Sequence, residues 1–454
     1  MRHELIPDND AVFRWVEQIF AQGERRPGSP ADRWTERFCL ERFRELGLEN
    51  VRAEPVELPY WEPRRASVTA WRDGPDASRL TLECFPLPHT APGVVEGPLA
   101  RFDFESPDDV RGRIALRDES LVRIPHKAFT GVATWHYDPR HTMAESVQVM
   151  PFAPGRQLVA DAAIDAGALA FIGSILDFPG DSYRYYVPYD GVARPVPAVW
   201  IRGSDGARLR EMLAAGPVRA RIEVDAERHM TTSDNVIGEL PGEDEQLVIV
   251  GSHHDGPWAS AVEDASGVAL VLAQAEYWSR VPPSERPHRM LFLLTTGHMT
   301  GGIGTRAFIK AHEAELERTV LEVHLEHAAA EFAEKDGRLE PTGLPEARWW
   351  FTSRNAALED AVRSAIEAER LERSLILPPA VFGERPPTDA GAFHPAGVPL
   401  VSFLTAPFYL FDAMDTLDKI DREHLAAITR AAVRIIESTR GQTAESMRRE
   451  MRSA

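Results

Sequence analysis

The sequence predicts an α/β protein with a central, mostly parallel twisted sheet, helices on both faces of the sheet, and an inserted β-rich domain. From about residue 246 onwards, strand-like and helix-like segments alternate, which is typical of such a sheet. Between about residues 80 and 224 the pattern changes to short β-like runs with frequent proline and glycine. At 454 residues the chain is also long for one hydrophobic core. We therefore assign residues 1–79 and 225–454 to one domain and residues 80–224 to the insertion.

The first segment of the chain predicts two amphipathic helices. Apolar residues recur at helical spacing near the N-terminus, then a turn follows at 26–29, and a second helix is expected from about Ala31 to Leu46. Gly47 ends it. The strand-like runs of the insertion are residues 112–116, 167–172 and 196–201.

The alternating part of the chain predicts three buried strands and two helices. The strands are residues 246–251, 290–295 and 320–325, and the helices are residues 266–278 and 306–316. The last stretch, 421–449, is expected to form one long charged helix with a solvated face over an apolar stripe.

Composition restricts the class of protein and of ligand. Hydrophobic residues make up 43% of the chain and charged residues 27%, as in globular proteins, and no run is long and apolar enough to predict a membrane helix. A net charge of −19 repels phosphate backbones, so nucleic acid is not an expected partner. Because charged residues interrupt the first twenty residues, a signal peptide is not expected and a cytoplasmic location is. A small molecule or short peptide is the expected partner, and a homo-oligomer is possible.

Only two cysteines occur, Cys39 and Cys84, so a metal would have to be held by histidine and carboxylate side chains. The apolar run 248–251 leads into Ser252, His253, His254 and Asp255. Side chains alternate along a strand, so His253 and Asp255 can share a face while His254 points away. His253 could bind a metal while Asp255 fixes the ring or its surroundings. Alone, this triplet also fits polar residues at the end of a surface strand.

Three further acidic residues open a predicted helix or follow a predicted strand. Glu263 and Asp264 precede the helix that begins near Ser266, where Asp264 also fits an ordinary capping residue. Glu326 follows the strand that ends at Leu325. Histidine and two glutamates delivered to one edge of a sheet suit Zn, Mn or Fe better than a soft metal.

These segments together resemble the zinc aminopeptidase and glutamate carboxypeptidase family, which also contains the transferrin receptor ectodomain. The resemblance extends over essentially the whole chain, and residues 80–224 resemble the protease-associated domain that some members insert. It implies the family's α/β fold and a hydrolytic metal site. The matching segments are residues 26–29, 235–242, 251–256, 263–267, 301–305, 389–399 and 415–420.

The resemblance also implies roles for individual residues. Members of this type usually hold two metals bridged by one aspartate. The first-metal histidine corresponds to His253, its supporting aspartate to Asp255, the bridging aspartate to Glu263 and the remaining first-metal carboxylate to Glu326. All four positions keep suitable chemistry.

The positions private to the second metal differ from the family. In the family, a glutamate that acts as general base is followed directly by a glutamate that binds the second metal. When the family pattern is aligned without gaps to residues 301–305, these two positions correspond to His298 and Met299. The histidine that binds the second metal corresponds to Phe411. Neither a thioether nor a phenyl ring holds a hard or borderline divalent ion. We therefore expect one divalent metal ion. A shift of one residue would instead place Gly297 and His298 on the glutamate pair and make His298 a ligand.

The predicted activity is hydrolysis of an amide or peptide C–N bond in a small substrate. The metal would acidify a water molecule, and His298 would serve as general base, since the unperturbed imidazole pKa lies near neutrality. Two alternatives stay open: an aminohydrolase acting on a non-peptide substrate such as an activated aryl amine, and a receptor-like binding protein without catalysis.

Several other polar residues could contact the substrate, although ordinary structural roles fit them as well. They are Asp389, Arg306, Arg385, His327 and His394.

Overall fold

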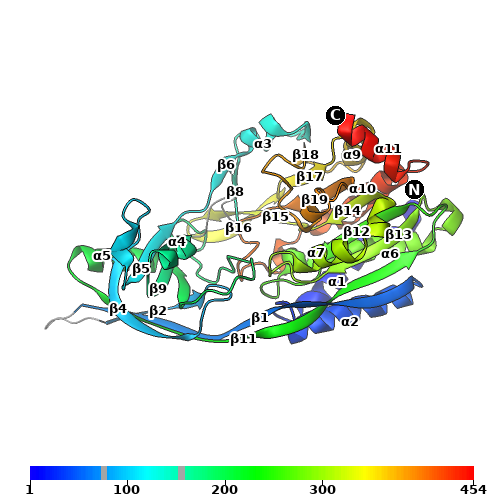
Figure 1. The fold of residues 1–454 in the computed structure, drawn as a ribbon. Coiled ribbons are helices and arrows are strands. Elements are labelled where there is room, and N and C mark those ends of the chain that lie inside the picture. Colours follow the sequence, from blue (N-terminus) through cyan, green and yellow to red (C-terminus); the bar gives the residue numbers. More distant parts are fainter. Residues whose placement is uncertain (73–78, 152–158, 454) are drawn as a thin grey trace.

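The computed structural model describes residues 1–72, 79–151 and 159–453, and its centre is a long, twisted sheet (Figure 1). Its middle strands are β13 (Arg289–Thr295), β12 (Leu247–His253), β14 (Thr319–Leu325) and β19 (Leu400–Thr405), and they run parallel in that order. Because these strands share one direction, their carboxyl ends lie at one edge of the sheet, where α/β proteins place their sites. The predicted fold class is confirmed.

Antiparallel strands extend this parallel centre on both sides. On one side lies β11 (Arg219–Leu240), which pairs with β1 (Glu49–Trp71). On the other side lies β17 (Arg348–Thr352), which pairs with β18 (Ser374–Leu377). The remaining strands are β2 (Arg79–Leu82), β3 (Cys84–Pro86), β4 (Gly93–Arg101), β5 (Ile114–Glu119), β6 (Arg123–Pro125), β7 (Trp135–Tyr137), β8 (Val147–Val149), β9 (Ala170–Ile175), β10 (Ala198–Arg202), β15 (Ala330–Lys335) and β16 (Arg338–Pro345).

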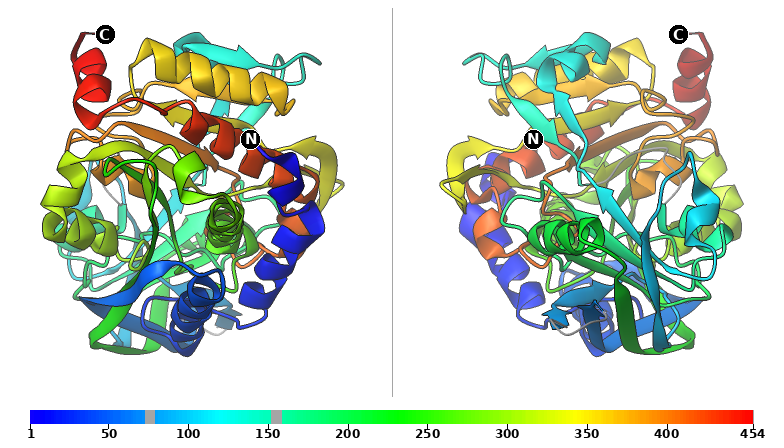
Figure 2. Two further views of the ribbon diagram at one scale, coloured as in Figure 1. Left: turned by 90° about the vertical axis from the view of Figure 1, so that its right-hand side faces the viewer. Right: turned by 90° about the vertical axis from the view of Figure 1, so that its left-hand side faces the viewer.

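Alternation along β12 assigns the two faces of the sheet. Val248 and Val250 belong to the core that contains α6 (Gly267–Arg280) and α10 (Leu425–Glu437), whereas Ile249 faces the core that contains Phe308 of α7 (Ile303–Ala311). Helices therefore cover both faces, as Figure 2 shows. The other α-helices are α1 (Asn9–Phe20), α2 (Pro30–Glu45), α3 (His126–Val132), α4 (Val159–Asp165), α5 (Gly203–Ala214), α8 (Glu313–Glu317), α9 (Ala356–Ala368) and α11 (Ala444–Ser453).

The first two helices begin at side-chain caps. Asp8 accepts a hydrogen bond from the backbone N–H of Ala11 at the start of α1, and Ser29 accepts one from Asp32 at the start of α2. Gly47, with φ of +76°, follows α2 in a conformation that favours glycine. Both helices lie where the sequence predicts them.

The β-rich segment lies at one end of the molecule and is joined to the rest by a long ribbon of β1 and β11, visible along the lower edge of Figure 1. Strands β4, β5, β9, β10 and β3 continue the sheet beyond β11. The same segment also supplies β7, which pairs with β18 at the opposite edge of the sheet. Residues 80–224 therefore contact the main domain at more than one place.

Two predicted helices differ from the structure. Residues 306–316 form α7 and α8, which are separated at His312, where the backbone leaves helical geometry. Residues 421–449 form α10 and α11, separated by a turn that contains Gly441 with φ of +76°. The prediction of one continuous helix was wrong because the backbone turns at Gly441, whereas the apolar residues of α10 are buried against α6, α9 and β14. In the described part of the chain, no helix has the length and apolar character needed to cross a bilayer.

Candidate metal centre and active site

His253 is the last residue of β12, and its ring is oriented by the backbone that follows it. Its Nδ1 lies 3.0 Å from the carbonyl oxygen of Asp255, so its Nε2 is directed towards Glu263, 3.5 Å from Oε1. Burial and the neighbouring histidines hold the pKa of His253 well below its usual value, with burial the larger effect. A neutral imidazole with one free nitrogen is the form that binds metals.

His254 points to the other side of the strand, as alternation predicts. Its Nδ1 lies 2.8 Å from Asp32 Oδ1 and its Nε2 lies 2.8 Å from the carbonyl oxygen of Asp234. Both ring nitrogens are thus engaged in structural contacts.

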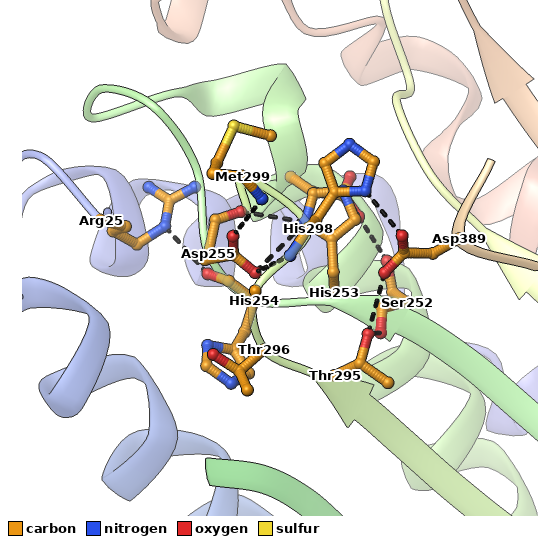
Figure 3. Close-up of polar contacts among 12 residues, drawn as sticks. Arg25, Ser252, His253, His254, Asp255, Thr295, Thr296, His298, Met299 and Asp389 are labelled. Carbon is orange, nitrogen blue, oxygen red and sulfur yellow. Dashed lines mark hydrogen bonds and ion pairs between the residues drawn. The ribbon is translucent and has the colours of Figure 1, made fainter. Parts of the chain in front are cut away.

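Asp255 positions the loop after β13 (Figure 3). Its carboxylate accepts hydrogen bonds from the backbone N–H groups of His298, at 3.1 Å, and Met299, at 2.8 Å. The closest approach of this carboxylate to His253 Nδ1 is 3.9 Å, which is too long for a hydrogen bond. Asp255 therefore holds the loop beside the His253 ring and does not bind the ring through its carboxylate. Burial raises the pKa of Asp255 to about 7.

The backbone of Glu263 is held by hydrogen bonds, while its carboxylate has no hydrogen-bond partner among the residues that the structure describes. Asp415 accepts hydrogen bonds from the N–H groups of Val262 and Glu263 at 2.8 and 2.9 Å. Arg25 donates to the carbonyl oxygens of Ser260 and Glu263. By contrast, Asp264 accepts from the N–H of Gly267, at 3.0 Å, which is the predicted capping role.

His298 is fixed by a buried carboxylate. Its Nδ1 lies 2.7 Å from Asp389 Oδ1, while Asp389 Oδ2 accepts from the hydroxyls of Thr295 and Thr305. The His298 Nε2 atom lies 3.4 Å from Glu263 Oε1. Burial lowers the pKa of His298, but Asp389 and Glu263 outweigh it and raise the pKa to about 10. The same ion pair holds the pKa of Asp389 well below its usual range against the effect of burial.

Glu326 and His327 both follow the end of β14. Glu326 Oε1 accepts from the N–H of Asp389, at 3.2 Å, and lies 2.9 Å from His324 Nε2, while His324 Nδ1 lies 2.7 Å from Glu322. His327 Nε2 lies 2.6 Å from Glu263 Oε2 without the alignment of a hydrogen bond. One ligand atom each of His253, Glu263 and His327 fall within 4.8 Å of one another.

Several buried polar atoms at this place have no hydrogen-bond partner among the described residues. They are His253 Nε2, His327 Nε2, both carboxylate oxygens of Glu263, and Glu326 Oε2. Burying such atoms unsatisfied is costly, and nitrogen and carboxylate oxygen are the donors that Zn and similar divalent ions prefer. The residues therefore fit a divalent metal ion.

Aromatic rings fill the side of the site where the family resemblance places a second metal. Phe411 stacks on Tyr189 with ring centroids 4.7 Å apart, Tyr189 stacks on His298 at 5.3 Å, and His298 stacks on His253 at 4.0 Å. Met299 is buried. Tyr189 comes from the inserted segment, and sequence reasoning gave it no role.

The residues that were predicted to contact the substrate lie in different parts of the site. Arg306 and Arg385 line a cavity to which His298 and Asp389 also contribute, whereas His394 does not line it. Asp389 contacts His298 directly, and His327 contacts Glu263. The last two therefore lie deeper in the site than a substrate-contact role requires.

Comparison with known proteins agrees with this geometry. Residues 235–436 match peptidase family M28. This match spans less than half of the chain. The chain is also 22% identical, over 392 residues, to carboxypeptidase Q from Mus musculus, with 83% of this chain and 73% of that protein covered.

Solved structures share the fold over nearly the full length. The peptidase M28 precursor from Shewanella amazonensis SB2B is 23% identical with a TM-score of 0.70, and the alignment covers 94% of this chain and 92% of that one. A zinc aminopeptidase from Bacillus subtilis is 18% identical with a TM-score of 0.65, covering 94% and 95%. The similarity to peptidase family M28 and to carboxypeptidase Q supports a metal-dependent peptidase, which favours an enzyme over the receptor-like alternative.

Proposed function

We propose that the chain hydrolyses an amide or peptide C–N bond in a small substrate with a single divalent metal ion. The observation that carries this proposal is the group of buried nitrogen and carboxylate atoms beside the His298–Asp389 pair that have no hydrogen-bond partner among the described residues. His253, Glu263 and His327 are the proposed ligands. Glu326, assigned as a ligand by the resemblance, lies beside them with Oε2 free for the same ion.

The metal would supply an acidified water molecule and polarise the carbonyl group under attack. His298 is the protein group suited to move the proton. Without a metal, its pKa of about 10 would keep the ring protonated, and the positive charge of a bound divalent ion would lower that pKa so that Nε2 can accept a proton. Asp389 holds Nδ1, so that Nε2 is the nitrogen directed into the site. In the reaction a bond forms between the water oxygen and the carbonyl carbon, the C–N bond breaks, and His298 takes the water proton and passes it to the leaving nitrogen. Asp389 stabilises the intermediate imidazolium, and Asp255 keeps the loop of His298 in place.

Two side chains support the proposal of one ion and not two. By the family resemblance, Met299 and Phe411 correspond to the private ligands of a second metal, and both are buried. Phe411 is further engaged in the ring stack through Tyr189. Opening this place for a second ion would cost both the apolar burial and the stack.

The test combines metal analysis with a substrate panel. We expect one tightly bound divalent ion per chain by mass spectrometry of metals, and turnover of amides that is abolished by a chelator and restored by metal. The panel should contain aminoacyl amides, dipeptides, N-acyl amino acids and activated aryl amines. Two tightly held ions with ordinary aminopeptidase turnover would contradict the single-ion proposal, and turnover of aryl amines alone would favour the aminohydrolase alternative.

A matched pair of variants separates loss of metal from loss of fold. His253→Gln removes one proposed ligand, whereas His254→Gln changes the neighbouring histidine on the other side of the same strand. Both can lower stability, but only the first should lower metal content at equal circular dichroism signal. Equal metal content in the two variants would count against the proposed centre.

A further inference from the structure

The cavity beside His298 lies between the inserted segment and the loops at the carboxyl edge of the main sheet. It has a volume of about 400 Å³, which is within the range of small-molecule sites. His298 and Asp389 form part of its wall, so a molecule in the cavity would reach the proposed catalytic group. Much of the remaining wall is apolar or aromatic, and includes Leu121, Ile175, Tyr185, Val187, Tyr189 and Trp200.

Each acidic group of the cavity wall has a cationic partner. The separations are 2.7 Å between Asp389 and His298, 2.9 Å between Asp190 and Arg194, and 3.4 Å between Glu119 and Arg117. These acids therefore leave little unbalanced negative charge in the wall.

The arginines of the wall are not balanced in the same way. Among the residues that the structure describes, neither Arg306 nor Arg385 has a carboxylate partner, and Arg306 Nη1 donates only to the carbonyl oxygen of Gly301. The chain as a whole carries a net charge of −19, so acidic side chains are abundant elsewhere. An unbalanced pair of guanidinium groups next to an apolar cavity is suited to an anion, since arginine binds carboxylates through two parallel hydrogen bonds.

The surroundings of Gly302 show that Arg306 lies near the His298–Asp389 pair. A Cβ atom at Gly302, whose φ is +71°, would lie 3.2 Å from Asp389 Oδ1 and 3.8 Å from Arg306 Nη1. Arg306 and Asp389 thus border the same small space. A substrate anion at Arg306 would lie a short distance from the bond that His298 acts on.

We infer that the cavity binds a small substrate with an aromatic or branched apolar body and a free carboxylate, which Arg306 and Arg385 hold. The inference rests on the proposed hydrolytic function, and it narrows the substrate class to acidic amides such as N-acyl amino acids. The apolar wall contributes most of the contact area, and the arginines select for the charge.

Equilibrium binding tests the inference without requiring turnover. The probes are 4-phenylbutyrate and its uncharged isostere 4-phenylbutyramide, titrated calorimetrically into metal-loaded protein. We expect the carboxylate to bind at least about tenfold more tightly than the amide, because a hydrogen bond to a charged group contributes roughly that much. In Arg306→Gln/Arg385→Gln the preference should fall towards unity, and in wild type it should weaken as salt rises.

A control arginine distinguishes this effect from a change in overall charge. Arg111 is exposed in the inserted segment, pairs with Asp108 and lies outside the cavity wall, so Arg111→Gln should keep the carboxylate preference. A preference that survives in the double variant, which would indicate binding of the carboxylate by the metal itself, overturns the inference. Equal binding of the two probes, or no saturable binding of either, also overturns it.

The outcome is separable from that of the proposed function. Metal-dependent turnover of uncharged amides with no carboxylate preference would refute the inference and leave the hydrolase proposal standing. Arginine-dependent binding without turnover of any amide in the panel would refute the hydrolase and leave the cavity as a site for acidic ligands.

Discussion

His298 and Asp389 are 91 residues apart in the sequence, yet their side chains form a buried ion pair at the wall of the cavity. Asp389 fixes which ring nitrogen faces the proposed metal centre. We expect Asp389→Asn to lower kcat/KM by about 10²-fold or more, since the contribution of a positioned acid–base group is of that size. Metal content should not change, because Asp389 is not among the proposed ligands. Steady-state kinetics and metal analysis of the same preparation measure both quantities.

Thr305→Val is the matched control for this change. It removes the hydrogen bond from Thr305 Oγ1 to Asp389 Oδ2 but leaves the ion pair with His298. We expect a much smaller loss of kcat/KM than in Asp389→Asn. Equal losses in the two variants would assign Asp389 a role in packing alone.

Glu326, the third ligand that the family resemblance implies, and His327, which lies close to Glu263, are the two candidates for the third metal ligand. His327 Nε2 contacts Glu263, whereas Glu326 Oε1 is engaged by His324 and by the N–H of Asp389. We therefore expect His327→Gln to weaken metal binding by at least about 100-fold, more than changes to groups behind the ligands usually do. Glu326→Gln should weaken it less. Competition with a chromophoric chelator at neutral pH gives both constants, and the reverse order would restore Glu326 as the third ligand.

The end of a strand explains why the sequence does not predict the orientation of His327. Strand β14 stops at Leu325, so alternation no longer applies at residues 326 and 327. His327 adopts a positive φ of 47°, which turns its side chain towards Glu263. The sequence places a polar pair after the strand but does not specify this turn.

At the scale of elements, the segment between β9 and β10 covers the site. The N–H of Tyr186 donates to the carbonyl oxygen of Phe411 at 2.8 Å, and Asp190 forms a β-bridge with Thr300. These contacts attach the inserted segment to two loops of the main domain. They also hold Tyr189 against His298.

Substitution of Tyr189 tests whether the packing of the inserted segment over the site affects activity. Tyr189→Ala removes the ring that stacks on both His298 and Phe411, and we expect kcat/KM to fall by about fivefold, since an aromatic pair contributes roughly 1 kcal/mol beyond burial. Tyr189→Phe keeps the ring and should retain most of the activity. If the phenylalanine variant loses as much as the alanine variant, the hydroxyl and not the stack is the important group.

Much of the site's framework could be predicted from sequence because it depends on local patterns. The apolar runs before His253, His298 and Glu326 predict buried strands, and the sheet brings their ends together. The cavity could not be predicted in this way. Its wall combines residues near 120, 175–200, 301–306 and 385–392, whose proximity depends on how the inserted segment packs. The break between α10 and α11 also depends on packing, because α10 is buried against several other elements.

At the scale of the whole molecule, His89 lies where the inserted segment meets the long ribbon of β1 and β11. Its ring centroid is 6.0 Å from that of Trp61 on β1, and its carbonyl oxygen accepts from the N–H of Arg194 and from Arg228 on β11. Burial lowers the pKa of His89 to about 4, and the two arginines add to this effect while Asp190 opposes it.

This buried histidine predicts a loss of stability in mild acid. Its pKa is lower in the folded state than the ordinary 6.5, so below pH 6.5 the unfolded chain binds a proton that the folded chain does not. The contribution of His89 to the free energy of unfolding therefore falls as pH drops from 6.5 towards 4, by roughly 2 kcal/mol between pH 7 and 5. His89→Asn removes the titration, and asparagine tolerates the positive φ of 60° at this position. Urea unfolding at the two pH values gives the free energy of unfolding of wild type and variant. The difference, variant minus wild type, should be about 2 kcal/mol larger at pH 5 than at pH 7. The control variant His136→Asn, at an exposed position, should show no such gain. If the free energies of unfolding of wild type and His89→Asn depend on pH in parallel, His89 is protonated in the folded protein.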